Sequence, residues 1–437
     1  MSPPIFLRGG FSFTNGHWHF ARRFQMGAGC TCSPLNNTMP VDPLRPMPCQ
    51  AILAGRAFTP HQEIADAVVV VEDGKITAVG RREKVAIPAG ARRYDARGLT
   101  VAPGFVDVHI HGAGGHDVME GTAEALGAVA STVARHGTTS LVATTVTASA
   151  EHTCRAVAGI AQWIESQREL PVGHAPQAEV LGIHFEGPFI SSARRGVHPP
   201  EWIVPPSAEL LRAITDAARG TGRILTLAPE LPGALELISE ARQAGLVVSL
   251  GHTDASYTET MDAIERGARH AAHVFNAMRP FEHRETGVIG AVLTSPTVTA
   301  ELIADGVHVD AAAMRLLLAA KGPGGVILVS DGTSATGMPD GTYRLGTFDV
   351  TVSGGVCRSA EGKLAGSTLT LDRALRTMAA LGVTLADALA MLTSNPARLL
   401  ALEGRKGALV PGADADLVLL DANLAVTGVM TRGAGIG

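Results

Sequence analysis

The pattern of apolar and polar positions changes after the first 48 residues of the chain. Residues 1–48 are rich in Pro, Gly, Asn and Met and show neither a helical nor a strand period, which predicts a disordered N-terminal tail. From residue 50 the sequence becomes β-rich, in QAILAGRAFTP and DAVVVVEDGKITAVG, and the DGK at 73–75 is a hairpin signal. We therefore predict a small β unit that begins near residue 49.

The next part of the chain alternates short apolar runs with Ala- and Leu-rich stretches, such as EALGAVASTVARHG, whose spacing fits helices. We predict strands at residues 106–111, 139–146, 179–187, 224–230, 246–253, 269–278, 299–309 and 325–333. Eight strands alternating with helices are typical of a (β/α)8 TIM-type barrel. A doubly wound open sheet is the alternative, but no strand is followed by a dinucleotide-type glycine fingerprint, so we predict the barrel.

Beyond the barrel pattern the sequence becomes β-rich again in TYRLGTFDVTVSGG, then helical, and closes with the strand-like GALVPGADADLVLLD. These patterns predict an α/β protein with a barrel over 101–405 and a β-hairpin insertion at about 341–365. The segments 49–100 and 406–437 are expected to form one small β-sandwich domain. The two ends of this part of the chain would then meet beside the barrel.

Composition narrows the class of protein. Hydrophobic residues make up 46% and charged residues 18%, enough for a packed core. A net charge of -5 gives no support for nucleic-acid binding. The sequence contains no run of about 18 apolar residues, so no membrane span is indicated. The five cysteines are odd in number and irregularly spaced, which argues against a disulfide framework. With no apolar core of a signal peptide near the start, we expect a cytoplasmic protein.

The stretch VAPGFVDVHIHG suggests where the chemistry lies, because His109 and His111 share one face at the end of a predicted strand. Further imidazoles and carboxylates lie toward the C-terminal ends of other predicted strands, namely Glu186, His252, His273, His308 and Asp331. The C-terminal strand ends of a barrel meet at one rim, so these side chains should converge. Because such groups bind divalent metals, we predict a catalytic metal site and metal-assisted hydrolysis, with Asp331 moving the proton of the attacking water.

Several segments resemble the amidohydrolase superfamily and, more closely, its N-acetylglucosamine-6-phosphate deacetylases. They are PGFVDVHIHG, HFEGPF, SLGHTDASY, AAHVFNAM, ADGVHVD and LVSDGT, and the resemblance extends over residues 50 to 437. It implies hydrolysis of the acetamide of N-acetyl-D-glucosamine 6-phosphate to D-glucosamine 6-phosphate and acetate, in amino-sugar catabolism and cell-wall sugar recycling. The alternatives are deacetylation of the galactosamine epimer or another N-acyl compound, and a non-catalytic protein on the same scaffold.

The resemblance also implies a ligand set for the metal. Glu186, His252 and His273 would hold one ion tightly, and a second ion could bind at His109, His111 and Glu186. We expect one or two divalent ions per subunit, with zinc favoured and iron, manganese or cobalt also accepted by these ligands.

For the reaction, the resemblance implies Asp331 as general base and then general acid, and His198 as a group that polarises the acetyl carbonyl. Substrate contacts are implied for His198, Asn276, Ala277 and His308. Arg284 matches an arginine that binds the sugar phosphate from a neighbouring subunit, which implies a homodimer.

Three further expectations concern the surroundings of the site. His184 shares a strand face with Glu186 and could support it or simply pack in the barrel core. His270 should face away from His273 and is expected not to be a ligand. The GTSATGMPDG run at 332–341 is typical of a flexible loop that could close over the site.

Overall fold

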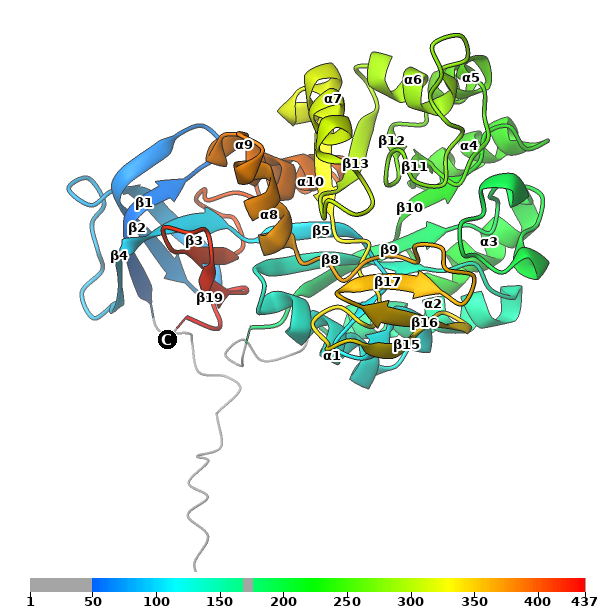
Figure 1. The fold of residues 1–437 in the computed structure, drawn as a ribbon. Coiled ribbons are helices and arrows are strands. Elements are labelled where there is room, and N and C mark those ends of the chain that lie inside the picture. Colours follow the sequence, from blue (N-terminus) through cyan, green and yellow to red (C-terminus); the bar gives the residue numbers. More distant parts are fainter. Residues whose placement is uncertain (1–48, 168–175, 437) are drawn as a thin grey trace, which may run out of the picture. The chain divides into compact units, whose positions relative to one another are not determined.

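An eight-stranded parallel sheet forms the centre of the molecule (Figure 1). The computed structural model describes residues 49–167 and 176–436, so the tail predicted for residues 1–48 lies outside the described residues. The strands are β5 (Phe105–Ile110), β8 (Thr138–Thr145), β9 (Glu179–Glu186), β10 (Gly222–Leu227), β11 (Val247–Leu250), β12 (His270–Ala271), β13 (Thr299–Ile303) and β14 (Val326–Val329). They follow one another in chain order, and a bridge between Ile110 and Gly332 brings the two edges together, so the predicted (β/α)8 barrel is confirmed.

The barrel strands are predictable because both of their faces are buried. Every residue of β5, β8 and β14 is buried, and parallel strands covered on both faces read as nearly continuous apolar runs. The strand β12 is the exception, because it covers two residues where ten were predicted. The chain after it turns sharply, with positive φ at His273, Phe275 and Ala277, and cannot continue as a strand.

Helices follow the strands and cover the barrel. They are α1 (Ala123–Ala134), α2 (Ala150–Ser166), α3 (Ala208–Ala217), α4 (Ala234–Gln243), α5 (Tyr257–Arg266), α6 (Gly287–Thr294), α7 (Ala311–Lys321), α8 (Leu371–Ala380), α9 (Leu385–Leu392) and α10 (Ser394–Leu399), with short 3-10 turns at Val118–Glu120, Ser192–Arg194, Pro200–Trp202 and Pro323–Gly325. Side-chain caps fix several starts: Thr122, Ser149 and Ser207 each accept a hydrogen bond from a first-turn backbone N–H.

A six-stranded sheet joins two segments that lie far apart in the sequence (Figure 1, blue and red). It contains β1 (Gln50–Phe58), β2 (Glu63–Glu72), β3 (Lys75–Arg81), β4 (Arg92–Pro103), β18 (Leu417–Leu420) and β19 (Val426–Met430). In this sheet β4 pairs in parallel with β1 and antiparallel with β18, and the sheet packs on an apolar core of its own. The small β unit that the sequence predicts from both segments is therefore present.

A buried cluster of charges links this sheet to the barrel. The ammonium of Lys406, only 1% exposed, lies 2.6 Å from Glu179 at the start of β9. It also lies 3.0 Å from Asp414 and 2.7 Å from Asp416, just before β18. We call Lys406, Glu179, Asp414 and Asp416 the junction cluster. The chain itself supplies the cations for these carboxylates, because Arg405 also pairs with Glu179 and Asp414.

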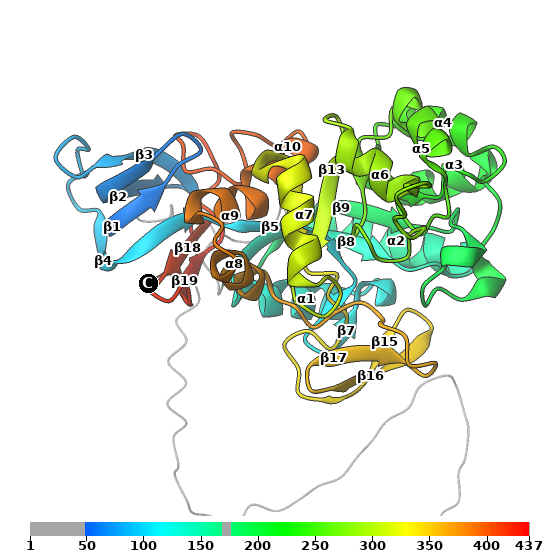
Figure 2. The same cartoon turned by 45° about the horizontal axis from the view of Figure 1, so that its top comes forward.

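A third, antiparallel sheet of three strands is inserted between β14 and α8, in the region where a β-hairpin was expected (Figure 2). It comprises β15 (Gly341–Leu345), β16 (Phe348–Ser353) and β17 (Val356–Ser359), and a two-stranded pair, β6 (Gly112–Ala113) and β7 (His116–Asp117), lies beside it. Of the expected loop at 332–341, which leads into this sheet, the first half is buried and residues 337–340 are exposed. Thr333, Ser334 and Thr336 are buried, and Thr333 donates its hydroxyl proton to the carbonyl of Ser367.

Two further observations concern the helices and the cysteines. Within the described ranges, no helix is long and apolar enough to cross a membrane. Cys49, Cys154 and Cys357, the cysteines that the structure describes, are all free.

Candidate metal and catalytic site

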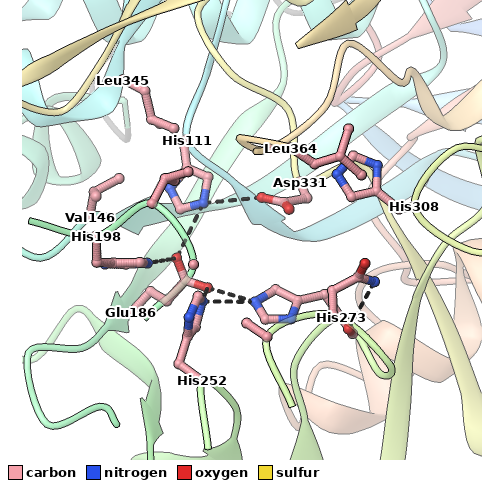
Figure 3. A pocket seen from close by; sticks show the side chains of 15 residues that line it. His111, Val146, Glu186, His198, His252, His273, His308, Asp331, Leu345 and Leu364 are labelled. Carbon is pink, nitrogen blue, oxygen red and sulfur yellow. Dashed lines mark hydrogen bonds and ion pairs between the residues drawn. The ribbon is translucent and has the colours of Figure 1, made fainter. Parts of the chain in front are cut away.

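A cavity of about 170 Å³ opens at the C-terminal ends of the barrel strands (Figure 3). Its lining is His111, Val146, Glu186, Gly196, Val197, His198, His252, His273, Asn276, Ala277, His308, Asp331, Leu345, Leu364 and Gly366. Glu186 is the last residue of β9, whereas His252, His273 and Asp331 each follow a strand by two residues. The rim position predicted for these residues is what the structure shows.

Three of these residues share an unusual backbone conformation. His252, His273 and Asp331 have φ values of 48°, 28° and 49°. Residues other than glycine seldom adopt a positive φ, and those that do are concentrated at functional sites. The sharp turn at each strand end thus places an imidazole or a carboxylate in the mouth of the barrel.

The carboxylate of Glu186 is the centre of the group. Its Oε1 lies 3.2 Å from His252 Nε2, 3.0 Å from His273 Nε2 and 3.2 Å from His109 Nε2. Its Oε2 lies 3.4 Å from His111 Nε2. All five side chains are buried, so their interactions are screened little by water. Four imidazoles from the ends of three strands, β5, β11 and β12, therefore converge on one carboxylate.

Asp331 lies on the other side of the first histidine pair. Its Oδ1 is 3.2 Å from His111 Nε2 and 3.8 Å from His109 Nε2. The same two imidazoles thus face both Asp331 and Glu186. Three groups of three possible ligands result around these carboxylates: two contain Glu186, and one joins His109 and His111 to Asp331.

In three of the imidazoles, the hydrogen bond made by Nδ1 determines whether Nε2, the nitrogen that faces Glu186, is free to bind a cation. Each Nδ1 contacts an oxygen that can only accept a hydrogen bond: His252 with the carbonyl of Arg194 at 3.0 Å, His111 with the carbonyl of Thr144 at 3.0 Å, and His109 with the carboxylate of Glu301 at 2.8 Å. Each Nδ1 must then carry the proton, so in the neutral ring Nε2 presents a lone pair. These lone pairs point at carboxylate oxygens, and His109 Nε2 is buried without a hydrogen-bond partner.

Such a convergence of lone pairs and anions requires a positive charge. Among the described residues that line the cavity, none is Lys or Arg. Burial opposes the charged form of Glu186, yet the neighbouring histidines, His109 first, hold the pKa of its carboxyl well below the usual range. Burial likewise opposes the cationic form of His109, but Glu301 and Glu186 raise its pKa well above the usual value. The donor set fits a divalent metal ion.

His198 differs from the other imidazoles. Its Nδ1 accepts a hydrogen bond from the backbone N–H of Thr147 at 3.3 Å, so the neutral ring carries its proton on Nε2. That nitrogen lies 3.3 Å from Glu186 Oε2 and faces the cavity (Figure 3). His198 can therefore donate a hydrogen bond to a ligand oxygen, which is the role that the sequence resemblance implies.

The residues expected to contact substrate lie in two places. Asn276, Ala277 and His308 line the cavity, and His308 donates from Nδ1 to Asp305 at 2.7 Å. Arg284 is exposed in the segment between β12 and α6 and does not line the cavity of its own chain. The structure thus brings all the predicted site residues together except Arg284.

Sequence reasoning missed Glu301, a fully buried carboxylate in the middle of β13. It accepts hydrogen bonds from His109 Nδ1 at 2.8 Å and from the backbone N–H of His273 at 2.9 Å. Its other oxygen accepts from His270 Nε2 at 2.8 Å, so His270 lies behind the site, away from the converging nitrogens. A lone acid in the apolar run TAELI was the available signal, because a buried carboxylate needs a partner.

His184 is a buried core residue beside the site. Its Nε2 lies 2.7 Å from the hydroxyl of Thr226 and its Nδ1 lies 3.2 Å from the carbonyl of Val108. Burial, with the nearby His109, lowers the pKa of His184 to about 3, so the ring is neutral. Its edge packs against His109, with ring centroids 4.7 Å apart.

Comparison with protein families matches residues 100–434 to the model described as the amidohydrolase family. The N-acetylglucosamine-6-phosphate deacetylase of Bacillus subtilis (strain 168) is 37% identical over 376 residues, which cover 86% of this chain and 94% of that protein. The N-acetylgalactosamine-6-phosphate deacetylase of Escherichia coli O157:H7 is 38% identical over 381 residues, covering 87% of this chain and 97% of that one.

Solved structures give the same picture. A mutant N-acetyl-D-glucosamine-6-phosphate deacetylase from Mycobacterium smegmatis, in complex with N-acetyl-D-glucosamine-6-phosphate, matches with a TM-score of 0.82 and 37% identity, over 89% of this chain and 99% of that one. The N-acetylglucosamine-6-phosphate deacetylase of Thermotoga maritima matches with a TM-score of 0.78 and 32% identity, over 89% of this chain and 99% of that one.

Proposed function

The chain belongs to the amidohydrolase family, in the branch of the N-acetylglucosamine-6-phosphate deacetylases, and we propose that it hydrolyses the acetamide of N-acetyl-D-glucosamine 6-phosphate. The products would be D-glucosamine 6-phosphate and acetate. One observation carries the proposal: a metal-binding group around Glu186, a hydrogen-bond donor at His198 and a carboxylate at Asp331 all face one cavity. Such an enzyme would work in the cytoplasm on amino sugars from catabolism or cell-wall recycling.

The bound metal would act as a Lewis acid that polarises the acetyl carbonyl and lowers the pKa of the attacking water. Glu186, His252 and His273 would hold the first ion, because their ligand atoms lie within 3.2 Å of one another. His109 and His111, which also face Glu186, would hold a second ion. Zinc suits this set of nitrogen and oxygen ligands, and iron, manganese or cobalt are also compatible with it.

Asp331 and His198 would move and stabilise charge during the reaction. The Asp331 carboxylate takes the proton of the attacking water and then delivers it to the leaving amine. The neighbouring imidazole of His111 holds the pKa of Asp331 below its usual value, although burial acts in the opposite direction. His198 donates its Nε2 proton to the acetyl oxygen, where negative charge develops.

The sugar phosphate would lie on the far side of the cavity from His198. His308 lies on that side (Figure 3), and Asn276, Ala277 and His308, which all line the cavity, would contact the sugar. Arg284 is exposed, so in a homodimer it would bind the phosphate of the substrate held in the cavity of the neighbouring subunit. A guanidinium suits phosphate because its planar fork makes paired, charge-assisted hydrogen bonds.

The test is acetate release from a panel of N-acetyl sugars, with and without a chelator. We expect turnover of the 6-phosphate, little turnover of the unphosphorylated sugar, and loss of activity on chelation that added metal restores. Arg284→Ala should raise KM for the phosphorylated sugar, whereas Arg212→Ala, an exposed arginine on α3, should leave it unchanged. Equal turnover with and without phosphate would exclude the phosphate role.

A second substrate has a specific observation in its favour. The galactosamine-specific relative from Escherichia coli is as similar to this chain as the glucosamine-specific ones. The same panel should therefore include N-acetylgalactosamine 6-phosphate, and the ratio of the two kcat/KM values will assign the epimer.

A further inference from the structure

The cavity has an apolar wall on the side of His198. Val146, Val197 and Leu345 contribute this wall, and all three belong to one apolar cluster that joins the barrel to the inserted sheet. In Figure 3, Val146 and Leu345 lie on the side of His198 and His111, across the cavity from His308. The hydroxyls of a sugar would find no hydrogen-bond partners on such a wall, whereas an alkyl group needs none and can pack against it.

The position of His198 relates this wall to the acyl group of the substrate. The ring is held by the backbone N–H of Thr147, the residue directly after Val146. If Nε2 of His198 binds the acyl oxygen, the carbonyl carbon lies next to it and carries only two other groups. The nitrogen leads to the sugar and must point to the polar side of the cavity. The alkyl group is then left to face Val146 and Leu345.

The turn that carries Leu345 is fixed on both sides of this residue. The N–H of Gly346 donates to the buried carboxylate of Asp117 at 2.7 Å, and the carbonyl of Arg344 accepts from the hydroxyl of Ser334. The turn also packs tightly on the barrel, because a Cβ on Gly346 would lie 3.4 Å from Val146 Cβ. Leu345 itself is 2% exposed. The wall is therefore built in and does not depend on a closing lid.

From these contacts we propose that Leu345, with Val146 behind it, closes the acyl pocket and restricts the substrate to short N-acyl groups. The inserted sheet β15–β17 then has a role in specificity, since it supplies the residue that sets the length of the acyl chain. This inference rests on the proposed function and adds to it the class of acyl group accepted. Leu345 is a specificity-determining residue, and it takes no part in bond breaking.

The test compares N-acetyl, N-propionyl and N-butyryl glucosamine 6-phosphate with wild type and Leu345→Ala. We expect the kcat/KM ratio of propionyl to acetyl substrate to rise by about tenfold or more in the variant, the usual size of a one-methylene effect in an apolar pocket. The ratio is measured within one sample, so it is unaffected if part of the variant protein is unfolded. Leu345→Phe should have the opposite effect and favour the N-formyl substrate.

Leu364→Ala is the matched control. Leu364 lines the same cavity but lies beside His308 and Asp331 (Figure 3), so its truncation should change the acyl ratio less than twofold. An unchanged ratio in Leu345→Ala, or an equal change in Leu364→Ala, would overturn the inference while leaving deacetylation in place. A wild-type protein that hydrolyses none of the three substrates would overturn the proposed function, and the inference with it.

Discussion

The molecule contains two buried clusters of carboxylates, and they are balanced in opposite ways. In the junction cluster, Lys406 lies within 3.0 Å of three carboxylates and brings the compensating charge. At the barrel rim, Glu186 and Asp331 face imidazole lone pairs and no Lys or Arg among the described residues that line the cavity. Without a metal, only the imidazoles themselves could carry a compensating charge, and a bound divalent ion would supply it instead.

This difference indicates a structural role for the junction cluster and a binding role for the group at the barrel rim. A buried ion pair that the chain completes by itself holds two parts of the fold together and leaves nothing to bind. A buried group that lacks its cation costs stability in the free protein and gains it only when a metal binds. The two clusters should therefore respond differently to the same kind of change, and four predictions test this.

The largest effect should follow loss of the proton carrier. Asp331→Asn removes the acid–base group but keeps the side-chain shape, so kcat should fall by about 10³-fold. The free energy of unfolding should stay within about 1 kcal/mol of wild type, because no structural ion pair is lost. Turnover assays, urea denaturation and metal analysis measure the three quantities. More than a tenth of wild-type activity in a variant with full metal content would contradict the assigned role.

The reverse should hold at the junction cluster. Lys406→Met leaves the buried Asp416 without a cationic partner, whereas Glu179 and Asp414 keep Arg405. It should lower the free energy of unfolding by about 3–5 kcal/mol, with kcat of the folded fraction unchanged. Lys75→Met is the control, because Lys75 pairs with the same Asp414 at 2.5 Å but is 49% exposed. An exposed pair should cost about 1 kcal/mol or less. Equal losses in the two variants would show that burial does not decide the effect.

A smaller effect is expected behind the rim, at Glu301. Glu301→Gln weakens the acceptor that fixes the proton on His109 Nδ1, so metal affinity should fall by about 10–100-fold. Equilibrium dialysis measures this without reference to turnover. The matched control is Asp372→Asn, which alters a carboxylate–histidine pair with His136 remote from the cavity. Undiminished affinity in Glu301→Gln would mean that the hydrogen bond does not support the ligand.

The smallest expected effect is a change in the free energy of unfolding at low pH. Burial opposes ionisation of Asp414, but Lys406 and its neighbours lower the pKa of that carboxyl to about 2. The pKa of this carboxyl is therefore lower in the folded protein than in the unfolded chain, where it is about 4. Its ionisation stabilises the fold fully above pH 4, and this contribution is lost as the pH falls toward 2. Unfolding free energies measured between pH 5 and 2 should therefore decline by on the order of 1 kcal/mol more in wild type than in Lys406→Met. Parallel curves for the two proteins would contradict this linkage.

The parts of the fold that could be predicted are those determined by local pattern. Buried parallel strands read as apolar runs, so all eight barrel strands were found, and the rim position of Glu186 and His252 followed from barrel geometry. The role of Glu301 could not be predicted, because its partners depend on which side chains the neighbouring strands bring beside it. The same holds for Leu345, whose place in the cavity wall depends on how the inserted sheet packs.

The 332–341 stretch shows a different limit. Its Gly, Ser and Thr residues are typical of an exposed loop, yet Thr333 and Ser334 are buried with their hydroxyls hydrogen-bonded to carbonyls. Composition alone does not distinguish hydroxyl groups satisfied by water from those satisfied by backbone.

The pairing of β4 with β18 has a consequence for synthesis on the ribosome. The edge of β4 that meets β18 stays unpaired until the entire barrel has been synthesised, since β18 follows the barrel in the sequence. Open strand edges invite pairing with other chains. We expect stalled nascent chains that end before β18 to be cleaved by protease in β1–β4, and chains released after β19 to resist it.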